Sequence, residues 1–177
     1  MLYTYHYTSP VGGITIASNG TYLTGLWLDE QKYFPANLPL YDTAPSHLIF
    51  QQTKEWLDRY FKGEILYFTP PMQLTGTSFQ LAVWEILKQI PYGKTVTYKD
   101  IAIKIARQQN RTTLPTQAVG NAVAHNPISI IIPCHRVIGS NHMLTGYAGG
   151  LERKRLLLNL EGVHTDLFSF PHTKNPL

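Results

Sequence analysis

Polar and apolar residues alternate at the start of the chain, where Tyr3, Tyr5 and Tyr7 are separated by polar side chains. This period of two is typical of a strand with one buried face. Two further short apolar runs follow within residues 1–28, and the pair Asn19-Gly20 lies between them. Because both residues of that pair accept positive φ, the pair favours a tight hairpin. The pattern predicts an antiparallel meander of three strands.

Helical spacing replaces this alternation further along the chain. Apolar residues, among them Trp56 and Tyr60, recur at helical spacing between Ser46, which can cap a helix, and Gly63, which can end one. We interpret them as one amphipathic face packed on the sheet. Residues 64–76 contain prolines and are predicted to form an extended interdomain linker. Later helices are expected from Thr77 or Ser78 to just before Pro91, and over about 99–107, 117–125 and 151–160.

The run from Ile128 to Ile132 is apolar and mostly β-branched, which predicts a buried strand that the following proline ends. Next comes Cys134, the only cysteine in 177 residues. Most lone cysteines are buried and unreactive, and without its neighbours that interpretation would be favoured. However, His135 and Arg136 follow directly, and a base or cation beside a thiol lowers its pKa. Cys134 is therefore a candidate nucleophile.

Composition narrows the class of protein. Apolar residues make up 44% and charged residues 15%, which is enough apolar material for one domain or two small ones. No run of 18 apolar residues occurs and the N-terminus lacks the regions of a signal peptide, so we expect a cytoplasmic protein without membrane contact. The net charge of +4 is compatible with DNA binding. A single cysteine excludes an internal disulfide. With His6 and His47 as the only N-terminal histidines, no zinc site is expected there.

Four spaced motifs carry a family resemblance. They are Gln117-Ala118-Val119-Gly120, Asn126-Pro127, Pro133-Cys134-His135-Arg136-Val137 and Tyr147-Ala148-Gly149-Gly150. In this order they resemble the O6-alkylguanine-DNA alkyltransferases, also called methylated-DNA–protein-cysteine methyltransferases, over about residues 76–161 and more loosely before them.

The resemblance implies an α+β fold. A ribonuclease-H-like α/β domain (antiparallel meander plus helix) would span residues 1–75. A mostly helical domain with a helix-turn-helix and the active-site cysteine would span 76–163, and a C-terminal tail, partly frayed, 164–177.

The resemblance also implies a reaction. This family repairs DNA by direct reversal of damage. The alkyl group of O6-alkylguanine, and of O4-alkylthymine, moves irreversibly to the cysteine, here Cys134, after the nucleotide flips out of the duplex. His135 would take the thiol proton through a water, Glu161 would orient His135, and Tyr98 would contact the flipped base. Each molecule would act once, as a monomer and without a cofactor. The expectation of no metal comes from the residues of this chain instead, because some relatives carry a structural zinc in the N-terminal domain.

The implied partner is double-stranded DNA containing O6-alkylguanine, bound through the minor groove without sequence specificity. A helix over residues 117–125, which carries many small side chains, would enter that groove. Minor-groove readout is degenerate, which suits a protein that must accept any sequence. The implied DNA- or substrate-binding residues are Lys99, Gln117, Ala118, Gly120, Val123, Asn126, Arg136, Val137, Ser140, Tyr147, Ala148 and Gly149. For Arg136, a structural contact is favoured over DNA reading.

Three features depart from the family pattern. Gln117 stands where an arginine usually precedes Ala-Val-Gly and fills the gap left by the flipped base. The loop over residues 108–116 is longer than expected, and it carries Arg111. Ala148 replaces a hydroxyl residue found in some relatives. Without the resemblance, Tyr98 would be interpreted as a core residue and Glu161 as a solvent-facing residue at a helix end.

Two other functions stay open at this point. The first is a lesion-binding protein without catalysis, which Gln117 favours and the intact Cys134 disfavours. The second is a cysteine hydrolase that uses Cys134, His135 and Glu161, which would also need an oxyanion hole. Transfer of a labelled alkyl group to the protein separates the first from repair, and multiple turnover on an ester would identify the second.

Overall fold

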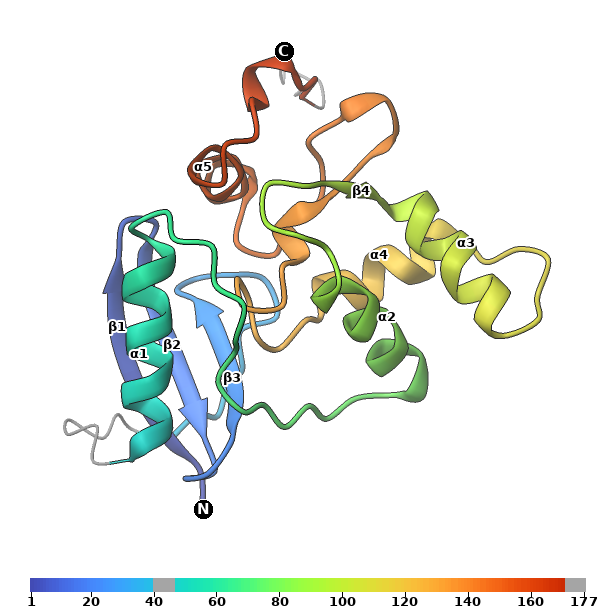
Figure 1. Cartoon of the computed structure of the whole chain (residues 1–177). Helices are drawn as coiled ribbons and strands as arrows, with labels where there is room; N and C mark the ends of the chain where they lie inside the picture. Colours follow the sequence, from blue (N-terminus) through green and yellow to red (C-terminus); the bar gives the residue numbers. More distant parts are fainter. Residues whose placement is uncertain (40–46, 171–177) are drawn as a thin grey trace, which may run out of the picture.

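A computed structural model of the chain describes residues 1–39 and 47–170. Three antiparallel strands form a sheet in the order β1-β2-β3, and one helix packs along it (Figure 1). These elements are β1 (Tyr3–Ser9), β2 (Gly12–Ser18), β3 (Leu23–Leu28) and α1 (Leu48–Tyr60). The predicted meander and helix are confirmed. Ser46, the predicted cap, lies outside the described residues, and His47 directly precedes α1.

The connection between β2 and β3 differs from the predicted tight turn. Residues 19–22 join the strands, and the side chain of Asn19 accepts hydrogen bonds from the backbone N–H groups of Thr21 and Tyr22 at 3.0 and 2.9 Å. Within the Asn19-Gly20 pair, only Gly20 has a positive φ, of 99°. The prediction of two residues at positive φ is wrong because the asparagine side chain builds the turn itself.

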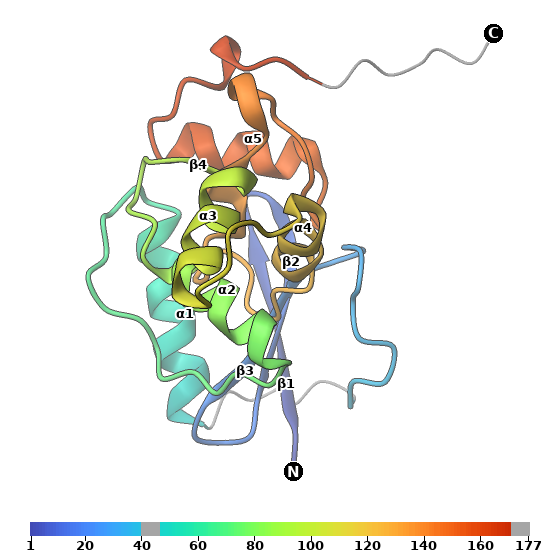
Figure 2. The ribbon, with the colours of Figure 1, turned by 90° about the vertical axis from the view of Figure 1, so that its right-hand side faces the viewer.

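The second half of the chain is mostly helical and contains a helix-turn-helix formed by α3 and α4. Figures 1 and 2 show α2, α3 and α4 as one group beside the sheet, with α5 at one end of the molecule. The elements are α2 (Ser78–Lys88), β4 (Val96–Thr97), α3 (Tyr98–Gln108), α4 (Thr116–Ala124), β5 (Val137–Ile138) and α5 (Leu151–Leu160), with 3₁₀ turns at Cys134–Arg136, Ser140–His142 and Thr165–Leu167. The segment that connects α3 to α4 is longer than the usual turn of about three or four residues.

Local sequence signals fix where α2 and α3 begin. Thr77 forms a capping box with Gln80, and Thr97 forms another with Asp100. By contrast, α4 has no side-chain cap. It is held by tertiary contacts instead, including a hydrogen bond of 2.9 Å from the indole of Trp84 on α2 to a backbone carbonyl of α4. The position of α4 therefore depends on packing more than on its own sequence.

The strand predicted over residues 128–132 does not form. Ile128 makes one isolated bridge to Leu26 of β3, and the chain then turns, with Ile130 at a φ of +70°. All five side chains of this run are nevertheless buried. The side-chain amide of Asn126 makes hydrogen bonds to this backbone that a neighbouring strand would otherwise make. It donates to the carbonyls of Ile128 and Ile132 and accepts from the N–H of Ile128. A short apolar run signals burial without specifying a strand, which explains the error.

The outer edge of β3 joins the two halves of the chain. Leu23 pairs with Met72 of the linker. Leu26 donates to the carbonyl of Pro127 at 2.9 Å and accepts from the N–H of Ser129 at 2.8 Å. An open strand edge tends to pair with other chains, and here it is covered by the segment that leads to the cysteine. The main apolar core includes side chains from both halves.

The first part of the predicted C-terminal tail is packed. Thr165 is buried, and the N–H of Leu144 donates to the carbonyl of Ser169 at 2.8 Å. The rings of His142 and Phe168 stack, with centroids 5.8 Å apart. Phe168 and Ser169 therefore lie beside the loop that follows β5, and partial fraying of the tail stays a prediction. The rest of the predicted tail lies outside the described residues.

A turn before β4 brings a backbone N–H against the end of α5. Gly93, in this turn, has a φ of +70°, a conformation that favours glycine. Its N–H donates to Oε2 of Glu161 at 3.1 Å. A Cβ added at Gly93 would lie 2.8 Å from the backbone carbonyl oxygen of Glu161. The turn thus leaves no room for a side chain.

We expect Gly93→Ala to lower the free energy of unfolding by about 2–3 kcal/mol, because it combines an unfavourable φ with a backbone clash. Gly63 is the matched control, since its φ is +83° and no atom lies within 4 Å of an added Cβ. Gly63→Ala should cost about 1 kcal/mol. Urea unfolding of both variants measures the difference. Equal losses would show that the turn yields to the extra methyl group.

Candidate active site

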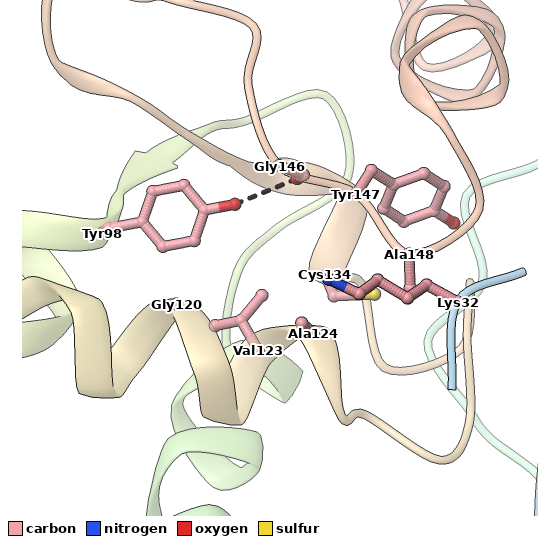
Figure 3. Close-up of a pocket in the computed structure, with 9 residues that line it drawn as sticks. All are labelled: Lys32, Tyr98, Gly120, Val123, Ala124, Cys134, Gly146, Tyr147 and Ala148. Atoms are coloured by element: carbon pink, nitrogen blue, oxygen red, sulfur yellow. Dashed lines mark hydrogen bonds between the residues drawn. The ribbon is translucent and has the colours of Figure 1, made fainter. Parts of the chain in front are cut away.

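A cavity of about 240 Å³ opens beside Cys134, between α4 and the loop before α5 (Figure 3). The small residues Gly120 and Ala124 of α4 form part of one wall, and a Cβ added at Gly120 would only touch the ring of Tyr98 at 3.8 Å. Small side chains on this face of α4 therefore leave the space open. The lining residues are Lys32, Tyr98, Gly120, Val123, Ala124, Cys134, Gly146, Tyr147 and Ala148.

The thiol of Cys134 is almost completely buried, with 4% of the residue exposed. The side-chain amide of Asn126 donates to Sγ at 3.2 Å and to the carbonyl of Ile132 at 2.8 Å. Burial raises the pKa of Cys134, and the hydrogen bond from Asn126 and the charge of Lys154 oppose this rise without cancelling it. The resting residue is therefore a neutral thiol that already has a hydrogen-bond donor beside its sulfur.

His135 is fully buried behind the cysteine, and its orientation is fixed by Glu161. Nε2 of the imidazole lies 2.7 Å from Oε1 of the carboxylate. An ionised carboxylate can only accept, so Nε2 carries the proton and Nδ1 presents a lone pair. Nδ1 has no hydrogen-bond partner among the described residues. No direct hydrogen bond between the Cys134 and His135 side chains is found within the described part of the chain.

The carboxylate of Glu161 accepts hydrogen bonds from several segments of the chain. Oε1 accepts from Tyr60 at 2.7 Å, from His135 at 2.7 Å and from Arg136 at 3.0 Å. Oε2 accepts from Arg136 at 2.8 Å and from the N–H of Gly93 at 3.1 Å. Burial alone would raise the pKa of Glu161, but its bonds to His135 and Arg136 outweigh burial and hold the pKa well below its usual range. Glu161 is therefore ionised and buried, and the solvent-facing interpretation is wrong.

Two buried residues at this site escaped prediction. Tyr60 was interpreted only as part of the helix face on the sheet, yet its hydroxyl reaches Glu161. Lys154 on α5 is also fully buried, and its ammonium donates to the carbonyls of Val137, Thr145 and Gly146. Burial lowers the pKa of Lys154 to about 7. The sequence held a signal for the burial of Lys154. This residue lies three positions after the apolar Leu151 and three before Leu157, a spacing that places all three on one helix face. Tyr60 had no such signal.

The N-terminal half also contributes to the mouth of the cavity. The N–H of Lys32 donates to the carbonyl of Ala148 at 2.9 Å, and the Lys32 side chain lines the cavity (Figure 3). The ring of Tyr33 stacks on His125, with centroids 3.9 Å apart. Lys32 and Tyr33 also line an outer cavity of about 570 Å³, together with Gln117. No sequence pattern had marked this loop as part of the site.

The predicted site residues fall into two groups. The cavity brings together Cys134, Tyr98, Gly120, Val123, Tyr147 and Ala148. The others lie outside it. Ala118 lines a separate groove beside α2, and Lys99 and Ser140 are exposed. Val137 and Gly149 are buried without lining the cavity.

The hydroxyl of Tyr98 points toward the loop before α5 and donates to the carbonyl of Gly146 at 3.0 Å (Figure 3). Tyr98 is therefore not simply a core residue, because its ring lines the cavity as well. Arg136 is buried, and its guanidinium contacts Glu161 and the carbonyl of Ile90. This is the structural contact favoured for it from the sequence.

Across residues 1–39 and 47–170, no group of three or more His, Cys, Asp or Glu side chains lies close enough to hold a metal ion. Over the same residues, no helix is long and apolar enough to cross a membrane.

Family comparisons cover nearly the whole chain. Residues 1–74 match the ribonuclease-like domain of 6-O-methylguanine DNA methyltransferase, and residues 78–163 match its DNA binding domain. The methylated-DNA–protein-cysteine methyltransferase of Haemophilus influenzae is 41% identical over 163 residues, which is 92% of this chain and 87% of the relative. The protein of the same name from Mycobacterium tuberculosis is 44% identical over 153 residues, covering 86% and 88%.

Solved structures agree with these matches. The M. tuberculosis OGT in complex with DNA superimposes with a TM-score of 0.78 at 42% identity, covering 94% of this chain and 96% of that one. The O6-methylguanine DNA methyltransferase of Methanococcus jannaschii has a TM-score of 0.61 at 26% identity, covering 97% and 100%. Both halves of the chain and their shared fold therefore match one group of proteins, and the chain belongs to the 6-O-methylguanine DNA methyltransferase family.

Proposed function

We propose that this protein repairs alkylated DNA by moving the alkyl group of O6-alkylguanine to Cys134 in one irreversible turnover. The observation that carries the proposal is a buried thiol at the base of a cavity beside α4, with a histidine–carboxylate pair behind it. Relatives that share more than two fifths of their sequence with this chain bear the name of this activity. O4-alkylthymine, predicted as a second substrate, stays a proposal.

The chemistry follows from the three side chains. His135 accepts the thiol proton on Nδ1 through a bridging water. Its Nε2–H remains bound to the ring and stays hydrogen-bonded to the carboxylate of Glu161. The sulfur then attacks the alkyl carbon, so that an S–C bond forms and the C–O6 bond breaks. The bonding electron pair goes to O6, and the guanine takes up a proton that balances the one lost by the thiol. A thioether has no good leaving group, so each molecule acts once.

DNA would bind on the face that carries α4, as the family's DNA binding domain implies. We propose that α4 enters the minor groove, that the damaged nucleotide flips into the cavity, and that Tyr98 exchanges its bond to Gly146 for one to the base. Flipping is required because the reacting atom lies inside the base stack. A net charge of +4 fits binding without sequence preference. We further propose that the protein acts as a monomer in the cytoplasm.

Incubation with a duplex that contains O6-methylguanine should add one methyl group to the peptide that contains Cys134, after which activity should stop. The reason is that Cys134 is the sole cysteine and its thioether cannot be cleaved. Intact-protein and peptide mass spectrometry measure this. Cys134→Ser should abolish transfer and keep DNA binding. Sustained turnover would favour the hydrolase alternative, and binding without any transfer would favour the lesion-binding one.

Glu161→Gln should slow methyl transfer by about 10²–10³-fold, because His135 loses the negative charge that stabilises its protonated form. Loss of the equivalent group in serine proteases costs about 10⁴, and a thiol gives up its proton more readily than a serine hydroxyl. Single-turnover kinetics at pH 7 are the measurement, with circular dichroism as a check on folding because the change also removes the charged partner of Arg136. A rate equal to that of the unmodified protein would remove Glu161 from the mechanism.

Gln117 and Arg111 are the two candidates for assisting base flipping. Gln117 lies exposed on the first turn of α4, and Arg111 lies exposed in the loop before it. We expect Gln117→Arg to strengthen binding to methylated duplex DNA and to speed repair there, with a smaller gain on single strands. An added cation that neutralises one phosphate should steepen the salt dependence of duplex binding by about 0.9.

The comparison variants are Gln117→Ala and Arg111→Ala, tested on duplex and single-stranded substrates across a salt series. If Arg111 already supplies the charge, Arg111→Ala weakens duplex binding and Gln117→Arg changes little. If both Gln117 variants behave like the unmodified protein on duplex DNA, residue 117 has no part in flipping.

A further inference from the structure

We propose that Tyr60 of α1 is a positioning residue of the proton relay, and that its hydroxyl shares the Glu161 carboxylate with His135 and so limits how strongly the imidazole holds a proton. This inference rests on the proposed alkyl transfer to Cys134. It assigns a role in the reaction to the N-terminal half of the chain, which supplies none of the other side-chain groups that contact the carboxylate.

The geometry identifies the hydroxyl of Tyr60 as a dedicated donor to the carboxylate. It lies 2.7 Å from Oε1 of Glu161 and 3.4 Å from Nε2 of His135, and only 1% of the residue is exposed. Because Glu161 is ionised and Nε2 already carries a proton, the phenol must donate to Oε1. The imidazole and the phenol therefore compete for the same carboxylate oxygen. Burial and the nearby charge of Glu161 raise the pKa of Tyr60, so it remains a donor at all ordinary pH values.

The ring of Tyr60 is held in place by packing. It stacks on Trp56, with centroids 5.2 Å apart and an angle of 10° between the planes. The indole of Trp56 donates to the carbonyl of Phe68 in the linker at 2.8 Å, and the rings of Tyr60 and Tyr92 meet in a T-shaped arrangement with centroids 6.2 Å apart. Because its ring is buried and packed against these two aromatic rings, Tyr60 can change little besides the torsion of its O–H bond. This is the property expected of a group that sets a distance rather than reacts.

Several groups set the affinity of His135 for a proton. Burial lowers the pKa of His135, the bond to Glu161 and its negative charge raise it, and the charges of Arg136 and Lys154 lower it. Cys134 adjoins the histidine in the chain, and Tyr147 and Tyr92 are the other ionisable groups near the carboxylate. Arg136 and Tyr60 both donate hydrogen bonds to the carboxylate whose negative charge raises the pKa of His135. Removal of the Tyr60 hydroxyl should leave Oε1 more available to Nε2–H and so raise the pKa of His135.

The sign of the effect follows from this competition. His135 must be neutral to accept the thiol proton, so transfer is lost as the pH falls through the pKa of His135. Tyr60→Phe raises that pKa, and the acid limb of the rate profile should move upward by roughly half a unit to one unit. A purely structural role would lower the rate equally at every pH and leave the pKa of His135 unchanged.

The test uses full-length protein and a methylated duplex, with single-turnover rates measured from about pH 5 to pH 9 across the range where histidine titrates. Tyr92→Phe is the matched control, because its hydroxyl donates to the carbonyl of Leu160 at 3.1 Å and does not contact the carboxylate. We expect the acid limb to shift for Tyr60→Phe and to stay in place for Tyr92→Phe. Equal shifts in both variants, or none in either, would overturn the proposal.

A second measurement is independent of the reaction. The pKa of His135 is read by NMR titration of carbon-labelled imidazole in Cys134→Ala protein, with and without Tyr60→Phe. Tyr60→3-fluorotyrosine covers the case in which the phenylalanine variant does not fold, since fluorine makes the phenol a stronger donor and should lower the pKa of His135. An unchanged pKa would overturn the role of Tyr60 even where methyl transfer is intact. A shifted pKa in a protein whose unmodified form transfers no methyl group would instead overturn the proposed function.

Discussion

The buried charge of Glu161 is the constraint on which the rest of the structure depends. An ionised carboxylate removed from water is costly unless it is both paired and hydrogen-bonded. Here it receives a guanidinium, an imidazole, a phenol and a backbone N–H, and these come from the Cys134 segment, α1 and the turn before β4. The interaction that orients His135, the proposed catalytic base, also ties together three distant parts of the chain, so folding and the orientation of His135 cannot be separated.

This dependence explains why the N-terminal half belongs to the site although it holds none of the family's catalytic motifs. Its edge strand β3 pairs with the segment that leads to the cysteine, the hydroxyl of Tyr60 donates to the carboxylate of Glu161, and Lys32 lines the cavity. The two halves share one apolar core. In the proposed active site, the ribonuclease-like domain therefore supports the carboxylate of Glu161 and part of the cavity wall, and the helical domain carries Cys134 and α4.

Local signals made part of this predictable. The capping boxes at Thr77 and Thr97 and the alternating tyrosines of β1 are encoded within a few residues, and the motifs around Cys134 indicated the family. The predictions that failed concern features that depend on residues distant in the sequence. The run 128–132 turns because the amide of Asn126 satisfies its backbone, and Tyr60 looks like any apolar residue of a helix face until Glu161 is placed beside it. Hydrogen bonds between distant segments leave no periodic trace in a sequence.

The state of the thiol is consistent with a protein that reacts once. A permanently ionised and accessible thiolate would react with any electrophile, and each such event would consume one molecule. Burial keeps Cys134 protonated, while the amide of Asn126 already donates a hydrogen bond to the sulfur, a contact that would stabilise the thiolate. On the proposed mechanism, ionisation requires His135 to accept the proton, and Cys134 lines the cavity that the flipped base would enter. On the proposed mechanism, selectivity for the lesion comes from keeping Cys134 as a neutral thiol until a substrate occupies the cavity.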